Sequence, residues 1–196
     1  DKDNFNNYLK TIIKQIKQIE NLVNEFSDFA RMPKPIFKKI NLNKLIQRSI
    51  DLNKLSKPNI NFNINFKQKD FFINGDEEQL NRVYINLIKN SIESMEDKEE
   101  KNGDFTKKIN VEIYKDNDYI YSEIEDNGVG FVNVDVKSII TPYFTTKKNG
   151  TGLGLSIVNK IVNDHNGKIE FIPIKDGAKV NITFNLNDSW STYSWW

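Results

Sequence analysis

The segment 149-NGTGLGLSIV-158 places three glycines within five positions, directly before an apolar run. Glycine-rich loops at helix starts are typical phosphate-binding elements, because exposed backbone N–H groups lie at the positive end of the helix dipole. A P-loop would need a Lys and then a Ser or Thr directly after its last glycine. Here Leu155 and Ser156 follow Gly154. The segment therefore predicts a helix that begins in a phosphate-binding loop of a different design.

The chain around this loop alternates between helical and strand-like segments. The apolar residues of 60-INFNINF-66 alternate with Asn, which indicates a strand with one buried face. Asp76 is a good N-cap for the helix that follows it, and the polar stretch 96–104 is expected to be a loop. We expect helices over 1–30, 42–52, 77–95 and 153–165, a short apolar piece at 71–73, and strands over 60–66, 109–114, 119–125, 168–174 and 179–186.

Short links predict that most neighbouring strands are antiparallel. The tetrapeptide 115-KDND-118 joins two of them, and Asp176-Gly177 joins the last two. Strands and helices mixed in this way indicate the α+β class, in the form of a two-layer α/β sandwich.

The first thirty residues predict one helix with a narrow apolar seam. Such a heptad seam requires a partner helix, whereas a helix packed on its own domain usually shows a wider stripe. That second arrangement remains the alternative. Pro33 and Pro35 end the helix, so residues 32–40 are expected to be a linker. The seam consists of Leu9, Ile12, Ile16, Ile19, Val23, Phe26 and Ala30.

Composition excludes several classes of protein. The 196 residues carry a formal net charge of +1 and no cysteine, so disulfides, thiolate zinc sites and cysteine nucleophiles are excluded. Charge of both signs is interspersed, which gives no support to nucleic-acid binding. No apolar run approaches the roughly 20 residues that cross a bilayer.

Four short motifs occur in a fixed order along the chain: 86-NLIKN-90, 126-DNGVG-130, 142-PYFTTKK-148 and 150-GTGLGL-155. Their order and spacing resemble the N, G1, F and G2 boxes of sensor histidine kinase catalytic domains, a branch of the GHKL ATP-binding superfamily. The run 26-FSDFARMPKP-35 resembles the junction before the catalytic domain in kinases of the nitrogen-regulation type. The resemblance implies the Bergerat-type ATP-binding fold, preceded by a dimerisation helix.

The resemblance implies an ATP site and a role for each motif residue. Asp126 would accept a hydrogen bond from the adenine amino group, which favours ATP over GTP; a turn-capping Asp is the alternative. Gly128 and Gly130 would let the backbone approach the nucleotide. Asn90 resembles the Mg²⁺ ligand, and an amide oxygen suits that ion. Gly177 and Thr183 lie in a region that resembles the last glycine-containing box, where Thr183 would contact the adenine side of the pocket; a simple strand Thr is the alternative. The remaining residues that it places at the nucleotide are Tyr143, Phe144, Thr146, Gly150, Thr151, Gly152, Leu153 and Gly154.

Two further residues carry expectations about catalysis. Lys147 would contact the terminal phosphates, although an idle surface lysine is the alternative. Asn86 stands where hydrolysing GHKL members carry a Glu that activates water, and an amide cannot take that proton. The resemblance therefore implies a protein-histidine kinase, with a GHKL ATPase clamp or an inactive binding module as alternatives. Tyr143 and Phe144 are expected to be apolar anchors of segment 131–152, which would cover the nucleotide.

The sequence contains one histidine, His165, which reads as a helix-terminal residue whose charged form the helix dipole favours. We do not expect it to accept phosphate. Residues 1–31 would then be the second helix of a dimerisation hairpin whose first helix and acceptor histidine are absent. Residues 41–187 would be the catalytic domain, and the Trp-rich residues 188–196 a tail or a remnant of cloning. The implied partners are a second copy and a response regulator, with a cytoplasmic location and any membrane attachment upstream.

Overall fold

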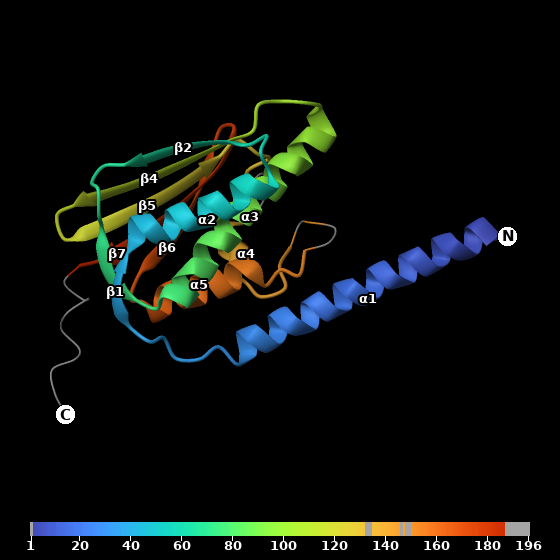
Figure 1. Ribbon diagram of the computed structural model, residues 1–196, viewed down its shortest axis with the longest axis horizontal. Coiled ribbons are helices and arrows are strands. Elements are labelled where there is room, and N and C mark those ends of the chain that lie inside the picture. The colour runs from blue at the N-terminus through green and yellow to red at the C-terminus, as the bar shows by residue number, and fades with distance from the viewer. Residues whose placement is uncertain (1, 132–134, 146, 148–149, 187–196) are drawn as a thin grey trace.

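A five-stranded sheet with helices α2, α3 and α5 on one face forms the body of the protein, and α1 projects away from it (Figure 1). The computed structural model describes residues 2–131, 135–145, 147 and 150–186. The helices are α1 (Lys2–Ala30), α2 (Leu42–Ser56), α3 (Glu77–Asn102), α4 (Val136–Ile139) and α5 (Gly154–Asp164). The strands are β1 (Lys38–Asn41), β2 (Asn61–Phe66), β3 (Phe72–Gly75), β4 (Lys108–Asp116), β5 (Tyr119–Asp126), β6 (Lys168–Ile174) and β7 (Gly177–Asn185).

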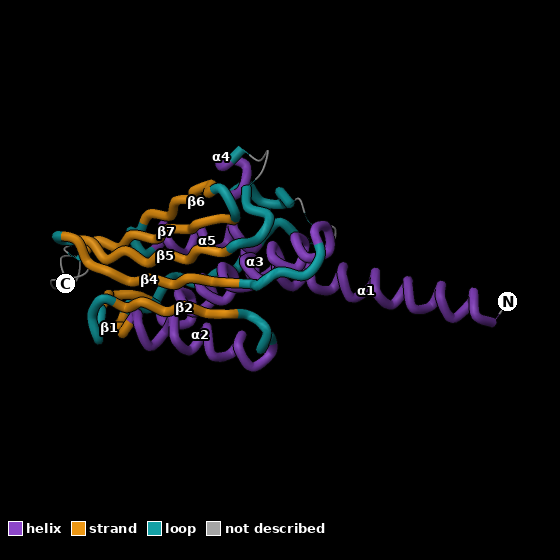
Figure 2. Tube along the Cα trace, turned by 90° about the horizontal axis from the view of Figure 1, so that it is seen from above, coloured by secondary structure: helices purple, strands orange, loops and turns teal. Residues whose placement is uncertain are grey.

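The large sheet has the strand order β2-β4-β5-β7-β6, and Figure 2 shows it as one layer beside the helices. Only the β2–β4 pair is parallel, so the expectation of mostly antiparallel neighbours is confirmed. A second sheet pairs β1 with β3, with Ile40 opposite Ile73. Strand β1 was not predicted, because its four residues contain a single apolar side chain and the first three lie in the expected linker.

Alternation along β5 determines which side chains face the helices. Ile120, Ser122, Ile124 and Asp126 are buried, whereas the residues between them are partly exposed. Since a strand has a side-chain period of two, Asp126 continues the row of core isoleucines. The last position of this row is therefore a carboxylate beneath the helical layer. The core also takes Leu80, Tyr84 and Ile88 from α3, Ile109 and Ile113 from β4, and Ile157, Val158 and Ile161 from α5.

Helix α3 is longer than the sequence analysis predicted. The stretch 96–104 was expected to be a loop, but α3 continues through Asn102 and ends at Gly103, whose N–H donates to the Glu99 carbonyl. Five of the six residues 96–101 are Glu or Lys, which are good helix formers, so they mark an exposed helix rather than its end. The buried Lys107 pairs with Glu99 and attaches the extension to the domain.

Helix α1 leaves its apolar seam uncovered. Ile12, Ile16 and Val23 are each more than half exposed, with Ile16 at 58%. The predicted helix is confirmed, and its seam has no partner within the described part of the chain. Among the described residues, none of the helices has both the length and the hydropathy required to cross a bilayer.

The contact between the segment after α1 and the start of α3 is centred on Asp76 and His165. The Asp76 side chain caps α3 and accepts a hydrogen bond from Ile36 N–H, while its own N–H donates to His165 Nε2 at 2.9 Å. His165 is 6% exposed, and burial lowers its pKa. The expectation that the helix dipole favours its charged form was wrong, because desolvation outweighs the dipole and Nε2 must accept a hydrogen bond.

Candidate nucleotide-binding site

The candidate site begins at Asp126, where β5 ends beneath α3. The Asp126 carboxylate accepts a hydrogen bond from Gly128 N–H at 2.9 Å, and the residue is 6% exposed. Burial raises its pKa, while hydrogen bonds from Gly128 and Ser91 and the charge of Lys147 oppose that shift. A buried carboxylate with remaining acceptor capacity is suited to receive an N–H group from a ligand.

Close backbone packing surrounds this carboxylate. A Cβ on Gly128 would lie 2.3 Å from Ser94 Oγ, and a Cβ on Gly130 would lie 2.3 Å from the carbonyl oxygen of Gly177. Gly130 also has a φ of +68°, which a side chain disfavours. Only glycine therefore lets the 126–130 turn lie against α3 and the start of β7. We call Asp126, Gly128, Gly130 and Gly177 the strand end of the site.

One face of α3 lines the site next to the strand end. Asn86, Asn90 and Glu93 follow one another at helical spacing, so their side chains share a face. Asn86 Nδ2 donates to the Arg82 carbonyl, and a Cβ on Gly154 would lie 3.2 Å from Asn86 Oδ1. The buried Asn90 Nδ2 has no hydrogen-bond partner among the described residues.

Lys147 reaches this α3 face from the loop before α5. Its Nζ donates to Asn90 Oδ1 at 3.3 Å and to Glu93 Oε2 at 2.5 Å. The amide oxygen of Asn90 therefore already points at a cation. Within the described ranges no three His, Asp or Glu side chains gather as a metal site. Any Mg²⁺ here would take most of its ligands from water and phosphate, as that ion commonly does.

The glycine-rich segment meets the same face at the start of α5. Leu153 is the N-cap of α5, and no side-chain oxygen caps the first turn. Gly152 has a φ of +70°, and a Cβ there would lie 2.4 Å from the Tyr143 backbone. Thr151 Oγ1 donates to Glu25 on α1 and accepts from Leu153 N–H. We call Lys147, the segment 150–153 and the first turn of α5 the loop end of the site.

The expectation that Tyr143 and Phe144 are apolar anchors was wrong. Both side chains are exposed, with Tyr143 at 56%. The backbone holds this segment instead, since Tyr143 N–H donates to the Gly152 carbonyl and Phe144 N–H donates to the Thr141 carbonyl. Thr146 and the Trp-rich tail lie outside the described residues.

Thr183 does not join the other predicted residues. It pairs with Tyr121 on β5, whereas Asp126 pairs with Ala178. Five residues of strand separate these positions, which corresponds to about 17 Å. Thr183 also faces the side of the sheet away from the helices, because the core residues Ile182 and Phe184 flank it. We therefore withdraw its expected contact with adenine.

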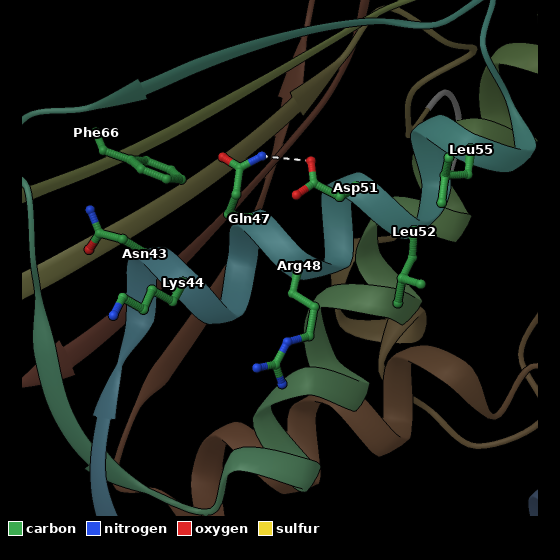
Figure 3. Close-up of a pocket in the computed structure, with 8 residues that line it drawn as sticks. All are labelled: Asn43, Lys44, Gln47, Arg48, Asp51, Leu52, Leu55 and Phe66. Carbon is green, nitrogen blue, oxygen red and sulfur yellow. Dashed lines mark hydrogen bonds between the residues drawn. The ribbon is translucent and has the colours of Figure 1, made fainter.

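A separate shallow pocket lies between α2 and the end of β2 (Figure 3). Several of its polar side chains already have partners: Asn43 donates to the Gln68 carbonyl, Gln47 bonds to Asp51, and Arg48 pairs with Glu77. The described residues that line this pocket do not include a buried carboxylate beside a glycine-rich turn, as the site at Asp126 does. The pocket is lined by Asn43, Lys44, Gln47, Arg48, Asp51, Leu52, Leu55 and Phe66.

Sequence reasoning missed two residues that the structure adds to the site: Glu93, which holds Lys147, and Glu25, which bonds to Thr151. Gly177, which was expected in the last glycine-containing box, lies against the Asp126 backbone. The helical spacing from Asn90 could have indicated Glu93. No local pattern could have indicated Glu25, because 126 residues separate it from Thr151.

Comparisons with known proteins agree with this geometry. Residues 75–188 match the family described as histidine kinase-, DNA gyrase B-, and HSP90-like ATPase. A Rickettsia felis protein named "sensor histidine kinase NtrY-like" is 38% identical over 189 residues, which cover 95% of this chain and 30% of that protein. The chain thus spans about a third of the length of such relatives.

Solved structures show the same likeness. The catalytic domain of histidine kinase ThkA superposes with a TM-score of 0.66 at 29% identity, covering 76% of this chain and 95% of that one. ThkA in complex with response regulator protein TrrA gives a TM-score of 0.71 at 25% identity, covering 91% and 50%. The α+β sandwich is thus the catalytic-domain fold of histidine kinases, and the chain belongs to the histidine kinase-, DNA gyrase B- and HSP90-like ATPase family.

Proposed function

We propose that this chain is the ATP-binding catalytic part of a two-component sensor kinase, which transfers the γ-phosphoryl group of ATP to a histidine. One observation carries the proposal: the buried Asp126 carboxylate and the cation-facing Asn90 amide converge beside the same face of α3. One end of the site offers a hydrogen-bond acceptor for a nucleobase, and the other end offers an oxygen for the metal ion at the phosphates. This arrangement suits a nucleotide. When bound, Mg²⁺ would neutralise phosphate charge.

Each part of the site has a proposed role in holding the nucleotide. Asp126 would accept the adenine amino group. The uncapped first turn of α5 would donate N–H groups to phosphate oxygens, where the helix dipole favours negative charge. Asn90 would present its amide oxygen to Mg²⁺, and Lys147 would contact the terminal phosphate. Catalysis of phosphoryl transfer depends mainly on such positioning and charge stabilisation.

Transfer is a better fit than hydrolysis, because Asn86 supplies no general base. Its amide Nδ2 is directed to the Arg82 carbonyl, and an amide cannot abstract a proton from water. His165 is not a suitable acceptor, since it is buried and both ring nitrogens are engaged by the backbone of Asp76 and Ile161. The acceptor histidine would therefore be supplied from outside this sequence.

The exposed seam of α1 supports a second proposal about assembly. A row of isoleucines on a 29-residue helix fits another helix of the same kind, so we propose a homodimer formed through α1. A response regulator would be the next partner, by analogy with the ThkA–TrrA complex. The proposed location is the cytoplasmic side of a bacterial sensor.

The test of the proposed function is calorimetric titration of ATP with Mg²⁺ into the wild type and Asp126→Asn, with GTP as the competing base. We expect ATP but not GTP to bind the wild type. The variant should lose about tenfold to a hundredfold in affinity, since a hydrogen bond to a charged group contributes about 1.5–3 kcal/mol. Asp116→Asn, at the opposite end of the sheet, is the matched control and should bind like the wild type.

The proposal fails if the wild type binds neither nucleotide, or if Asp126→Asn binds ATP normally. Steady phosphate release from ATP by the wild type would instead favour a hydrolysing member of the family. Transfer can be followed with labelled ATP and a separate helical fragment that carries the acceptor histidine.

A further inference from the structure

This inference rests on the proposed function and concerns the cation that the site requires. Lys147 Nζ lies between two oxygens of α3, Asn90 Oδ1 at 3.3 Å and Glu93 Oε2 at 2.5 Å. Glu93 stands three residues after Asn90, which makes the two side chains neighbours on the helix surface. The family resemblance assigned Asn90 but gave no role to Glu93.

The ammonium group of Lys147 lies within the site rather than at its rim. Its side chain is 27% exposed, and its charge contributes to the pKa of the buried Asp126. Lys89 also approaches Glu93, but at 3.9 Å and with a far more exposed side chain. Lys147 is therefore the main partner of the Glu93 carboxylate.

We propose that Glu93 and Asn90 form a cation-binding pair, which Lys147 fills before nucleotide binds and which the divalent cation of Mg²⁺·ATP takes over. An amide oxygen and a carboxylate oxygen are ligands that Mg²⁺ accepts, directly or through its waters. Lys147 is then released toward the phosphates, where its charge is needed.

The pair makes nucleotide binding depend on the metal. When Lys147 turns to the phosphates without a cation replacing it, the Glu93 carboxylate loses its main partner and keeps the more distant, exposed Lys89 while it lies beside a polyanion. Two like charges in a partly buried site repel each other strongly. Glu93 thus favours metal-loaded ATP and disfavours metal-free ATP, so it acts as a specificity-determining residue.

The experiment measures the dissociation constant of ATP twice, in excess Mg²⁺ and in EDTA, by calorimetry. The dissociation constant in EDTA is divided by the constant in Mg²⁺, and this ratio is compared among the wild type, Glu93→Gln and Glu77→Gln. Glu77 lies on the same helix and is also ion-paired, but it stands about 24 Å from Glu93 along the axis. We expect Glu93→Gln to reduce the ratio about fivefold or more, because metal-free ATP binds better and Mg²⁺·ATP binds worse. Glu77→Gln should keep the wild-type ratio.

A second variant separates charge from packing. Glu93→Asp keeps the carboxylate and should preserve most of the ratio. If Glu93 had only a structural role, Glu93→Asp and Glu93→Gln would change the ratio by the same amount. If Glu93→Gln weakens ATP binding equally in Mg²⁺ and in EDTA, or leaves the ratio unchanged, the inference is overturned. The proposed function would still be supported in that case, provided that the wild type binds Mg²⁺·ATP. Failure of the wild type to bind Mg²⁺·ATP would overturn both.

Discussion

The two ends of the candidate site are held by different forces. At the strand end, backbone approaches backbone so closely that a single added carbon on Gly128 or Gly130 would overlap a neighbour. At the loop end, the chain's own charged and polar groups occupy the proposed ligand positions: Lys147 is bound to Glu93, and Thr151 to Glu25. The strand end is therefore preformed by packing, whereas under the proposed function the loop end would exchange partners when a nucleotide binds.

This difference has a functional meaning for a nucleotide site. The base is the constant part of the ligand, so a rigid acceptor can select it with little reorganisation. The phosphates change during transfer, and charged groups that are held by other side chains rather than by close packing could follow that change. Three experiments test the distinction between packing and charge.

The largest expected effect is that of Gly177→Ala at the strand end. A Cβ there would lie 1.8 Å from the Asp126 carbonyl oxygen, and the φ of +143° strains any side chain. We expect the free energy of unfolding to fall by about 3 kcal/mol or more, as overpacking in a closed region does. Urea denaturation measures this loss.

Gly103→Ala is the matched control for that substitution. Gly103 also has a positive φ, +81°, but its Cβ would meet nothing within 4 Å. Only the conformational cost of about 1–3 kcal/mol should remain, because Gly103 has φ +81° and ψ −175°. Equal losses in the two variants would contradict the claim that close packing fixes the strand end.

An intermediate effect is expected from the pH dependence of His165. Burial lowers its pKa, so the unfolded chain binds a proton first as pH falls through the ordinary value of about 6.5. This contribution to stability is complete above that pH and decreases below it, by at most about 1.4 kcal/mol per pH unit. The melting temperature of the wild type should therefore fall between about pH 7.5 and pH 6.

His165→Gln tests this reading, because the sequence has no other histidine. A Gln oxygen can still accept from Asp76 N–H but carries no proton in this range. In the variant, the melting temperature should change much less with pH over this range. Parallel slopes for wild type and variant would show that groups other than His165 cause the pH dependence.

The smallest expected effect is that of Glu25→Gln at the loop end. Its carboxylate bonds to Thr151 beside the proposed phosphate position, so it should disfavour a polyanion. Neutralising it should strengthen Mg²⁺·ATP binding about threefold at low salt, and less at high salt, because the residue is partly exposed. Calorimetry of Glu25→Gln measures the gain, with Glu20→Gln on the exposed side of α1 as the control. A gain that is independent of salt would argue against a charge effect.

Local patterns predicted much of the molecule because they report local forces. Alternation identified β2 and β5, the Asp76 cap located the start of α3, and the heptad seam located α1. Local patterns failed where tertiary contacts determine the structure. The polar end of α3 was predicted as a loop, β1 as part of the linker, and His165 as charged. Tyr143 and Phe144 looked like anchors because apolar side chains usually are buried, yet the backbone holds that segment.

The sequence by itself determined the kind of site, because Asp126, Asn90 and the glycine-rich segment are residue types whose chemistry depends little on context. Only the tertiary structure decided which groups oppose one another across it. In the folded chain, Glu93 contacts Lys147 and Glu25 contacts Thr151. Thr183 lies five strand positions from the residue that pairs with Asp126. The physical reason is that sheet register and helix packing set distances between segments far apart in the chain, and no local pattern encodes those distances.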